Sequence, residues 1–128
     1  MNTRLVFAFV LTALMAGCAA PPPATQGLMD VAERPAEKAL LTGMRAYDDA
    51  QYPQAEKLLR QSLKDGLASP RDRAAAHKYL AFITCTSGRV PECEAEFRAA
   101  RAADPSFALS KSEAGHPQWG PVYLRSRQ

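Results

Sequence analysis

Apolar residues recur at helical spacing through the middle of the chain, in four consecutive stretches. Between positions 36 and 47 the apolar and small residues lie three or four positions apart, and the same spacing returns between 55 and 63. Positions 74–84 and 93–103 repeat it twice more. This spacing places one apolar stripe along each helix. The pattern therefore predicts four amphipathic helices and contains no alternation typical of strands.

Prolines and glycines mark where these helices begin and end. Pro53, Pro70 and Pro91 each stand at the start of an apolar stretch, where the missing N–H of proline is tolerated. Gly66 and Gly88 follow the ends of two stretches. Short connections between consecutive helices favour antiparallel neighbours. We expect an all-α fold, an antiparallel array of about two helical hairpins.

The order of small and large residues in the first hairpin returns in the second. The first set is Gly43, Tyr52, Ala55, Leu59, Ser62 and Leu63, and the second is Leu80, Ala81, Gly88, Cys93, Phe97, Ala100, Asp104 and Pro105. Both sets resemble the 34-residue tetratricopeptide (TPR) repeat, in which small residues let two helices cross closely. The resemblance implies that Gly43 faces Ala55 and that Ala81 faces Cys93. It implies a scaffold for protein binding and no particular ligand.

Residues 106–128 are too apolar for a free tail. The apolar members are Phe107, Leu109, Trp119, Val122, Tyr123 and Leu124. Glycines and prolines at 115, 117, 120 and 121 prevent one continuous helix. Because two repeats are fewer than the three or so that a stable stack needs, the repeats require a cap. We expect the tail to pack back on them and to end in a short helix begun by Pro121.

The first residues have the order of a secretory signal. Arg4 precedes the apolar run 5–15, which is shorter than the ~20 residues that span a bilayer, and Ala16-Gly17 leads to Cys18. The segment Met15-Ala16-Gly17-Cys18 resembles the bacterial lipobox, although Met15 replaces the usual leucine. The resemblance implies that residues 1–17 are removed and that Cys18 carries a diacylglycerol and an amide-linked palmitate-type chain. A plain secretory signal with an incidental cysteine, or an uncleaved membrane anchor, remains the alternative.

Residues 18–33 are interpreted as the acylated cysteine and a tether. Pro21–Pro23 favour an extended polyproline conformation that holds the folded part away from the lipid. Ala19 stands where an aspartate usually signals retention in the inner membrane, so the lipobox resemblance favours the outer membrane, facing the periplasm. The predicted organisation is a signal peptide (1–17), the tether (18–33), a repeat domain (34–105) and a capping tail (106–128).

Two cysteines remain once Cys18 is acylated. Cys85 and Cys93 lie on either side of a predicted hairpin turn. An even pair in an oxidising compartment favours a disulfide. The alternative is two buried thiols, since Cys93 fills a position that the repeat usually gives to alanine.

Charge and motif content disfavour several classes of function. The formal net charge is +3, with basic and acidic residues interleaved, so no nucleic-acid partner is expected. No phosphate loop, zinc box or nucleophile elbow is present, and His77 and His116 lack ligand spacing. The cluster Glu92, Glu94 and Glu96 suits the first turn of a helix. We therefore expect no enzyme activity, metal, cofactor or small-molecule substrate.

The second hairpin and the tail carry a more specific resemblance. The stretch 81–89 and the segment Gly115-His116-Pro117-Gln118-Trp119-Gly120-Pro121-Val122-Tyr123 resemble the TssQ-type accessory lipoproteins encoded with type VI secretion systems. The resemblance covers roughly residues 40–125. It implies an accessory role in the bacterial envelope and offers no catalysis to transfer.

The first helix of each predicted hairpin lines the concave groove in which TPR proteins usually hold a partner segment. By repeat position the predicted partner-binding residues are Leu40, Met44, Tyr47, Lys78, Tyr79 and Phe82. Packing of these side chains against the tail or a flanking helix is the alternative. The expected partner is a secretion-system or envelope protein. A pilotin-like chaperone for a secretin or pilus subunit, and a structural spacer, remain alternative functions.

Overall fold

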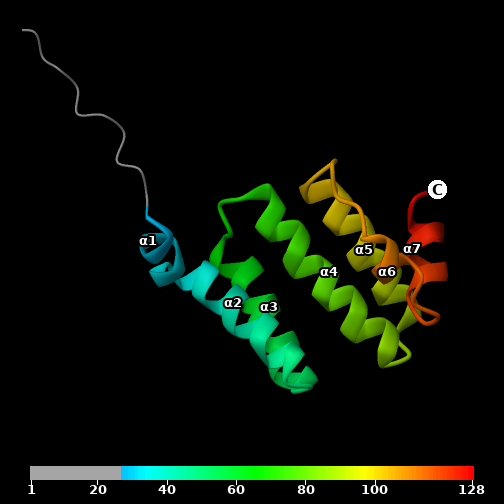
Figure 1. Ribbon diagram of the computed structural model, residues 1–128, viewed down its shortest axis with the longest axis horizontal. Coiled ribbons are helices and arrows are strands. Elements are labelled where there is room, and N and C mark those ends of the chain that lie inside the picture. The colour runs from blue at the N-terminus through cyan, green and yellow to red at the C-terminus, as the bar shows by residue number, and fades with distance from the viewer. Residues whose placement is uncertain (1–26) are drawn as a thin grey trace, which may run out of the picture.

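A computed structural model describes residues 27–128 of the chain (Figure 1). The predicted signal peptide, Cys18 and the first part of the predicted tether lie outside the described residues. From residue 27 onward the regular structure is entirely helical, which confirms the all-α class. The helices are α1 (Leu28–Glu33), α2 (Pro35–Asp48), α3 (Tyr52–Asp65), α4 (Pro70–Thr86), α5 (Val90–Ala103), α6 (Lys111–Ala114) and α7 (Gly120–Ser126).

Helices α2 and α3 form one antiparallel hairpin, and α4 and α5 form a second beside it (Figure 1). The two turns match in detail. Ala50 and Gly88 both have positive φ, of 59° and 76°. Immediately after each, a backbone N–H reaches back five residues, from Gln51 to the Ala46 carbonyl and from Arg89 to the Thr84 carbonyl, both at 2.8 Å. Gly88 adopts this left-handed conformation without the steric cost that Ala50 bears.

Proline lies in the first turn of all four long helices, at Pro35, Pro53, Pro70 and Pro91. This agrees with the helix starts expected from the sequence. Residues 28–33 differ from expectation, because they form α1 where the sequence analysis placed a tether. The backbone N–H of Gly27 donates to Asp30 Oδ2 at 3.2 Å, which caps this short helix.

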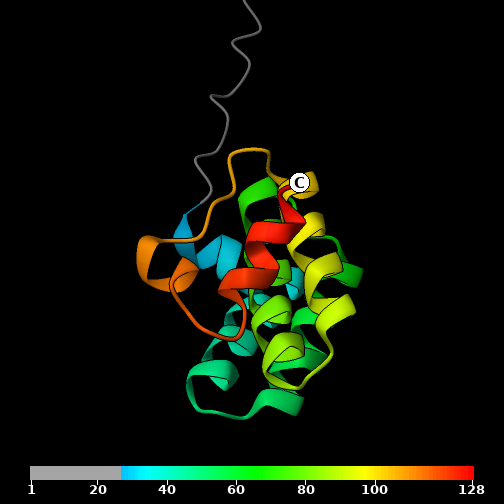
Figure 2. The same ribbon diagram turned by 90° about the vertical axis from the view of Figure 1, so that its right-hand side faces the viewer.

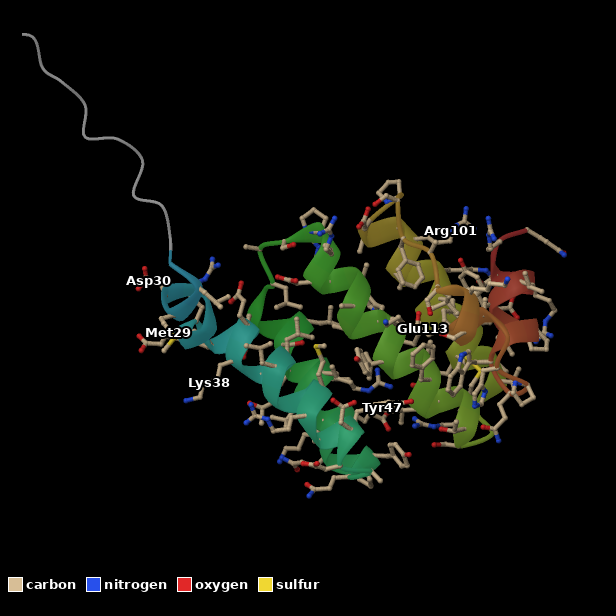
Figure 3. All side chains as sticks on the ribbon, in the orientation of Figure 1. Met29, Asp30, Lys38, Tyr47, Arg101 and Glu113 are labelled. Atoms are coloured by element: carbon tan, nitrogen blue, oxygen red, sulfur yellow. A yellow bond between two sulfur atoms is a disulfide. The ribbon has the colours of Figure 1, made fainter. Side chains whose placement is uncertain are left out.

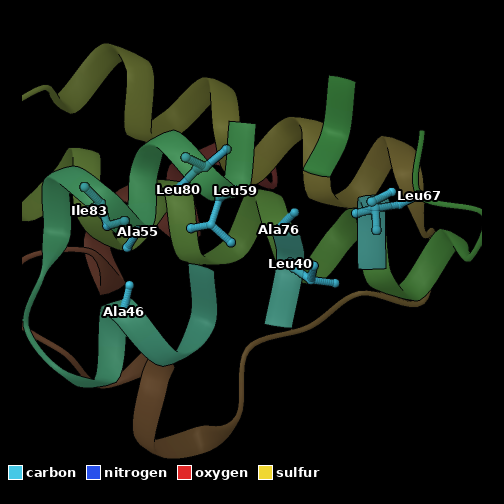
Figure 4. Packing of buried hydrophobic residues seen from close by; sticks show 9 residues of the cluster. Leu40, Ala46, Ala55, Leu59, Leu67, Ala76, Leu80 and Ile83 are labelled. Carbon is cyan, nitrogen blue, oxygen red and sulfur yellow. The ribbon is translucent and has the colours of Figure 1, made fainter. Parts of the chain in front are cut away.

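The first hairpin encloses a cluster of buried side chains shared with α4, shown in Figure 4. Its members are Ala36, Leu40, Ala46, Ala55, Leu59, Leu67, Ala76, Leu80 and Ile83. Gly43 lies against Leu59 and Leu58, because a Cβ built on it would stand 3.1 Å from Leu59 Cγ. Leu59 lies one helical turn after Ala55, the residue expected opposite Gly43. The reason for a small residue is unchanged: α2 and α3 approach closely at this point.

The second hairpin and the tail share another buried cluster. It contains Ala81, Phe82, Cys85, Cys93, Phe97, Leu109, Trp119, Val122 and Tyr123. The tail leaves α5, runs along α4 to α6, and returns so that α7 lies against α5 (Figures 1 and 2). The Leu109 N–H donates to the Tyr123 hydroxyl at 3.2 Å, which ties the start of the tail to its final helix. The expectation that the tail packs back on the second hairpin is confirmed.

The structure joins Cys85 to Cys93 by a disulfide, the pairing predicted from the sequence. The Cα atoms are 5.1 Å apart, and the bond links the last turn of α4 to the first turn of α5. Cys93 is fully buried and Cys85 nearly so. The bond therefore holds α4 and α5 together next to the turn that connects them, from inside the core.

Reduction of this disulfide is expected to lower the free energy of unfolding by about 2–3 kcal/mol, because the unfolded chain regains the freedom of a short closed loop. Urea unfolding with and without reductant, followed by circular dichroism, measures the loss. The Cys85→Ala/Cys93→Ala double variant should unfold at the same urea concentration in both conditions. A wild-type midpoint indifferent to reductant would contradict the expectation.

Candidate binding face

The structure places the six predicted partner-binding residues on α2 and α4, but it does not leave all of them accessible. Leu40 and Phe82 are each only 4% exposed. Leu40 packs in the core of the first hairpin, and Phe82 packs beneath the tail. Both are corrected from partner-binding to core residues. The physical reason is that α4 and the tail cover them, which a repeat position alone does not reveal.

The remaining four residues, Met44 and Tyr47 on α2 and Lys78 and Tyr79 on α4, together with Ala75 of α4, define what we call the inner face. All five are half-buried. Tyr47 lies on one side of α4 and Glu113 of the tail on the other (Figure 3). The inner face is therefore bounded by the first hairpin and by the tail.

Tyr47 is the centre of a row of aromatic rings on this face. Its ring meets Tyr79 edge-on with centroids 5.0 Å apart and Tyr52 at 5.5 Å. Burial, reinforced by the neighbouring tyrosines, raises the pKa of Tyr47 to about 12. Its hydroxyl therefore stays protonated at every physiological pH and is able to donate a hydrogen bond. Edge-to-face pairs of this kind hold the rings in fixed orientations.

Lys78 joins the inner face to the tail. Its Nζ lies 2.7 Å from Glu113 Oε1, and it also stands over the rings of Tyr79 and Phe82, at 5.2 and 5.7 Å from their centroids. Burial acts to raise the pKa of Glu113, but hydrogen bonds from Lys78 and Ser110 outweigh it and lower that pKa. Glu113 also forms a capping box with Ser110 at the start of α6. One carboxylate thus fixes both the short helix and its contact with α4.

Trp119 is the side chain by which the tail covers α4. Its ring stacks on Phe82 with centroids 4.3 Å apart and on His116 at 3.3 Å. Its Nε1–H donates to the Glu113 carbonyl at 2.8 Å. The apolar residues at 106–128 predicted a tail that packs back, but nothing in the sequence indicated the partner of Trp119. The tail therefore occupies the part of the predicted groove nearest the second hairpin.

A cleft of about 270 Å³ lies where α4 meets the start of the tail. Its lining residues are Arg71, Ala74, Ala75, Lys78, Asp104, Ser106, Phe107 and Ala108. Hydrogen bonds from Ser106 lower the pKa of Asp104, with a smaller contribution from the Arg71 charge. Ala75 and Lys78 belong to both the cleft and the inner face. The cleft was missed in the sequence because residues some 30 positions apart form it.

A network of charged side chains joins the second helices of the two hairpins. Arg89 contacts both carboxylate oxygens of Glu56, at 2.7 and 2.9 Å, and Arg60 lies 2.8 Å from the same group. Arg60 also reaches Glu92 and Glu96 of α5, at 2.5 and 3.4 Å. The hydrogen bonds from Arg89 and Arg60 lower the pKa of Glu56 to about 2. Glu92 and Glu96 of the acidic cluster predicted at the start of α5 thus bridge to α3.

The free energy of unfolding is expected to fall as the pH drops from about 4.5, the ordinary glutamate pKa, towards about 2, the pKa of Glu56 in the folded protein. Protonation in that window breaks a contact that exists only when the carboxylate is charged. At neutral pH, Glu56→Gln should cost about 1 kcal/mol, since half-exposed ion pairs are screened by water. Urea unfolding across the pH range measures both effects. Glu33→Gln, at an exposed carboxylate of α1, is the control, and an equal cost of Glu56→Gln at neutral and at very low pH would refute the assignment.

Both histidines contact side chains within residues 27–128. His77 Nδ1 lies 2.6 Å from Glu96 Oε2, and His116 stacks on Trp119. Among residues 27–128, no three histidine, cysteine or acidic side chains gather closely enough to hold a metal ion. In the same range, no helix is both long and apolar enough to cross a membrane. In comparisons with family models, curated proteins and solved structures, nothing matches the chain.

Proposed function

We propose that this chain is a lipoprotein of the bacterial outer membrane, acylated on Cys18 and facing the periplasm, that binds a segment of an envelope protein on its inner face. By its resemblance to TssQ-type proteins, it serves as an accessory of a type VI secretion system. The lipobox-like segment at 15–18 supports the anchor. The two matching helical hairpins support a TPR-like scaffold.

The observation that carries the binding proposal is the composition of the inner face. Met44, Tyr47 and Tyr79 are half-buried and apolar or aromatic, and they lie next to the fixed charge of Lys78. The tyrosine hydroxyls add hydrogen-bonding groups at the end of rigid rings. Faces of this kind, with aromatic anchors and few polar groups, are typical of protein interfaces.

The packing of the tail on α4 supports a choice of ligand. The tail presents the Trp119 ring to Phe82 and, from the short helix α6, the Glu113 carboxylate to Lys78. A partner segment with an aromatic residue and a hydrogen-bond acceptor would suit the adjoining Tyr47 and Tyr79 in the same way. We therefore infer a short peptide segment as the ligand, bound beside the tail.

The test is capture of envelope proteins from solubilised membranes by the tagged, acylated full-length protein, with identification by mass spectrometry. Ala75→Glu adds a charged side chain to the inner face without removing any core contact, and it should reduce partner capture by at least about tenfold, equivalent to 1.4 kcal/mol. Ala102→Glu, the same change at an exposed position of α5, should leave capture unchanged. Circular dichroism verifies that both variants fold.

The identity of the captured proteins separates the candidate functions. Type VI membrane components support the accessory role. Secretin or pilus subunits support a pilotin instead, and normal secretin multimers in a deletion strain argue against that alternative. If Ala75→Glu captures as much partner as the unchanged protein, the inner face is not the binding site. A Cys18→Ser variant that remains in the outer membrane after fractionation overturns the anchor.

A further inference from the structure

The end of the molecule at α1 carries exposed apolar side chains that no other part of residues 27–128 covers. Leu28 is 84% exposed, Met29 73% and Leu41 50%. Leu28 and Met29 begin α1, and Leu41 lies on the adjoining helix α2. Figure 3 shows Met29 and Lys38 together at this end of the fold. Large apolar residues gathered at one end of a small domain mark a contact surface more often than scattered ones do.

The two ends of the helical array differ in how far other segments cover them. Terminal units of a repeat stack usually need a polar outer face or a cap. At the far end the tail provides the cap, and its Val122 and Tyr123 are buried against α5. At the near end α1 is too short to cover α2, and Leu41 stays half-exposed. This end therefore keeps an apolar side chain free for another contact.

Basic side chains flank the apolar residues on the same surface of α2. Lys38 and Arg45 lie three and four positions to either side of Leu41, so all three share one helix face, and both basic residues are exposed. No acidic residue occurs between Lys38 and Tyr47. Asp30 and Glu33 of α1 balance these two positive charges. The surface therefore combines three exposed apolar side chains with two long basic side chains at its edge, a composition that suits the interface of a lipid bilayer.

The position of this surface along the chain identifies the partner. Ten peptide units separate Leu28 from Cys18, the proposed site of acylation, and a fully extended chain covers about 3.5 Å per residue. The anchor thus keeps α1 within about 35 Å of the lipid surface at all times. Because the tether holds this surface so close to the lipid, the effective concentration of membrane is high, and even weak apolar contacts are made often.

We propose that α1 and the outer surface of α2 dock on the membrane to which Cys18 is anchored, with Leu28, Met29 and Leu41 inserted at the headgroup level. This inference rests on the proposed acylation. Docking by this end points the tail away from the lipid and leaves the α4 part of the inner face, Ala75, Lys78 and Tyr79, accessible to a periplasmic partner.

The test uses acylated full-length protein in vesicles of phosphatidylcholine and phosphatidylglycerol. An environment-sensitive nitrobenzoxadiazole dye is attached at Leu41→Cys in one sample and at Leu124→Cys in the other. Leu124 is a matched position, because it is also an exposed leucine, 58% accessible, but lies on α7. Cys85 and Cys93 are buried in their disulfide and do not compete for the dye.

The dye at position 41 should emit at shorter wavelength when the protein is bound to vesicles. A nitroxide on the lipid headgroups should also quench this dye at least about twofold more strongly than the dye at position 124, because residues docked at the interface lie ~5–10 Å within the headgroup layer. Adding Leu28→Ser and Met29→Ser should bring position 41 to the level of position 124. These two side chains are exposed, so the fold should persist.

Three results would overturn the proposal, each in a different way. Equal quenching at 41 and 124 in protein that floats with the vesicles refutes the docking while the anchor stands. Protein that does not float at all refutes the anchor and the docking together. A wavelength shift that needs no lipid and grows with protein concentration assigns the surface to a second copy of the chain.

Discussion

Replacement of Trp119 by alanine is expected to lower the free energy of unfolding by about 3–5 kcal/mol, the usual cost of removing a large buried aromatic side chain. Only 9% of this residue is exposed, and its ring lies between Phe82 and His116. The change leaves a cavity under the tail and removes the donor to the Glu113 carbonyl. Urea unfolding followed by circular dichroism gives the loss directly.

Two further substitutions separate the contributions of the Trp119 side chain. Trp119→Phe keeps an aromatic ring on Phe82 but leaves the Glu113 carbonyl without its indole donor, and it should cost only part of the full effect, about 1–3 kcal/mol. Leu124→Ala, at an exposed position of the same tail, should change the free energy of unfolding by less than about 0.5 kcal/mol. A Trp119→Ala variant no less stable than Leu124→Ala would mean that the tail does not cap the second hairpin.

The consequence of losing this contact extends to the inner face. Trp119 and Glu113 belong to the same tail segment, and Glu113 holds Lys78. When the ring no longer holds the tail against α4, Lys78 loses its fixed partner and Phe82 becomes accessible. The tail therefore sets the limit of the surface available to a partner, as well as stabilising the second hairpin.

Helix positions and the disulfide were predictable because local patterns carry them. The three-and-four spacing of apolar residues, proline in first turns and glycine at turns are properties of segments shorter than 20 residues. Cys85 and Cys93 lie close in sequence across one of those turns, so their pairing follows from the hairpin itself. Residues 28–33 were missed because the proline-rich segment before them suggested a tether that continued into them.

The composition of the binding face was only partly predictable, because it depends on contacts between distant segments. Phe82 has the spacing of a face residue, and nothing within α4 distinguishes burial under Trp119 from exposure to a partner. Glu56 and Arg89 are likewise 33 positions apart, and their ion pair requires the two hairpins to be placed side by side. A periodic pattern identifies the apolar stripe of a helix, whereas the choice of neighbour for each residue in that stripe is made by the tertiary fold.

Gly120 is expected to be indispensable for the path of the tail. A Cβ atom at this position would lie 2.4 Å from the carbonyl oxygen of Ala114, which belongs to the backbone of α6 and has no rotamer by which to move away. Gly120→Ala should therefore force α6 and α7 apart and lower the free energy of unfolding by about 3 kcal/mol, the upper part of the range for overpacked sites. Urea unfolding measures the loss, and Trp119 fluorescence should report exposure of the ring.

Gly115→Ala is the matched control, five residues earlier in the same segment. Its φ of −80° suits any residue, and its added Cβ would meet the nearest backbone oxygens at 3.5 and 3.6 Å, an ordinary contact distance. Because alanine also restricts the unfolded chain, this substitution should be neutral or stabilise the protein by up to about 1 kcal/mol. Opposite signs for two chemically identical changes would show that the close approach of α7 to α6 determines the tail conformation. If Gly120→Ala were as harmless as Gly115→Ala, that close approach would not exist in solution, and the contact between Trp119 and α4 would need another explanation.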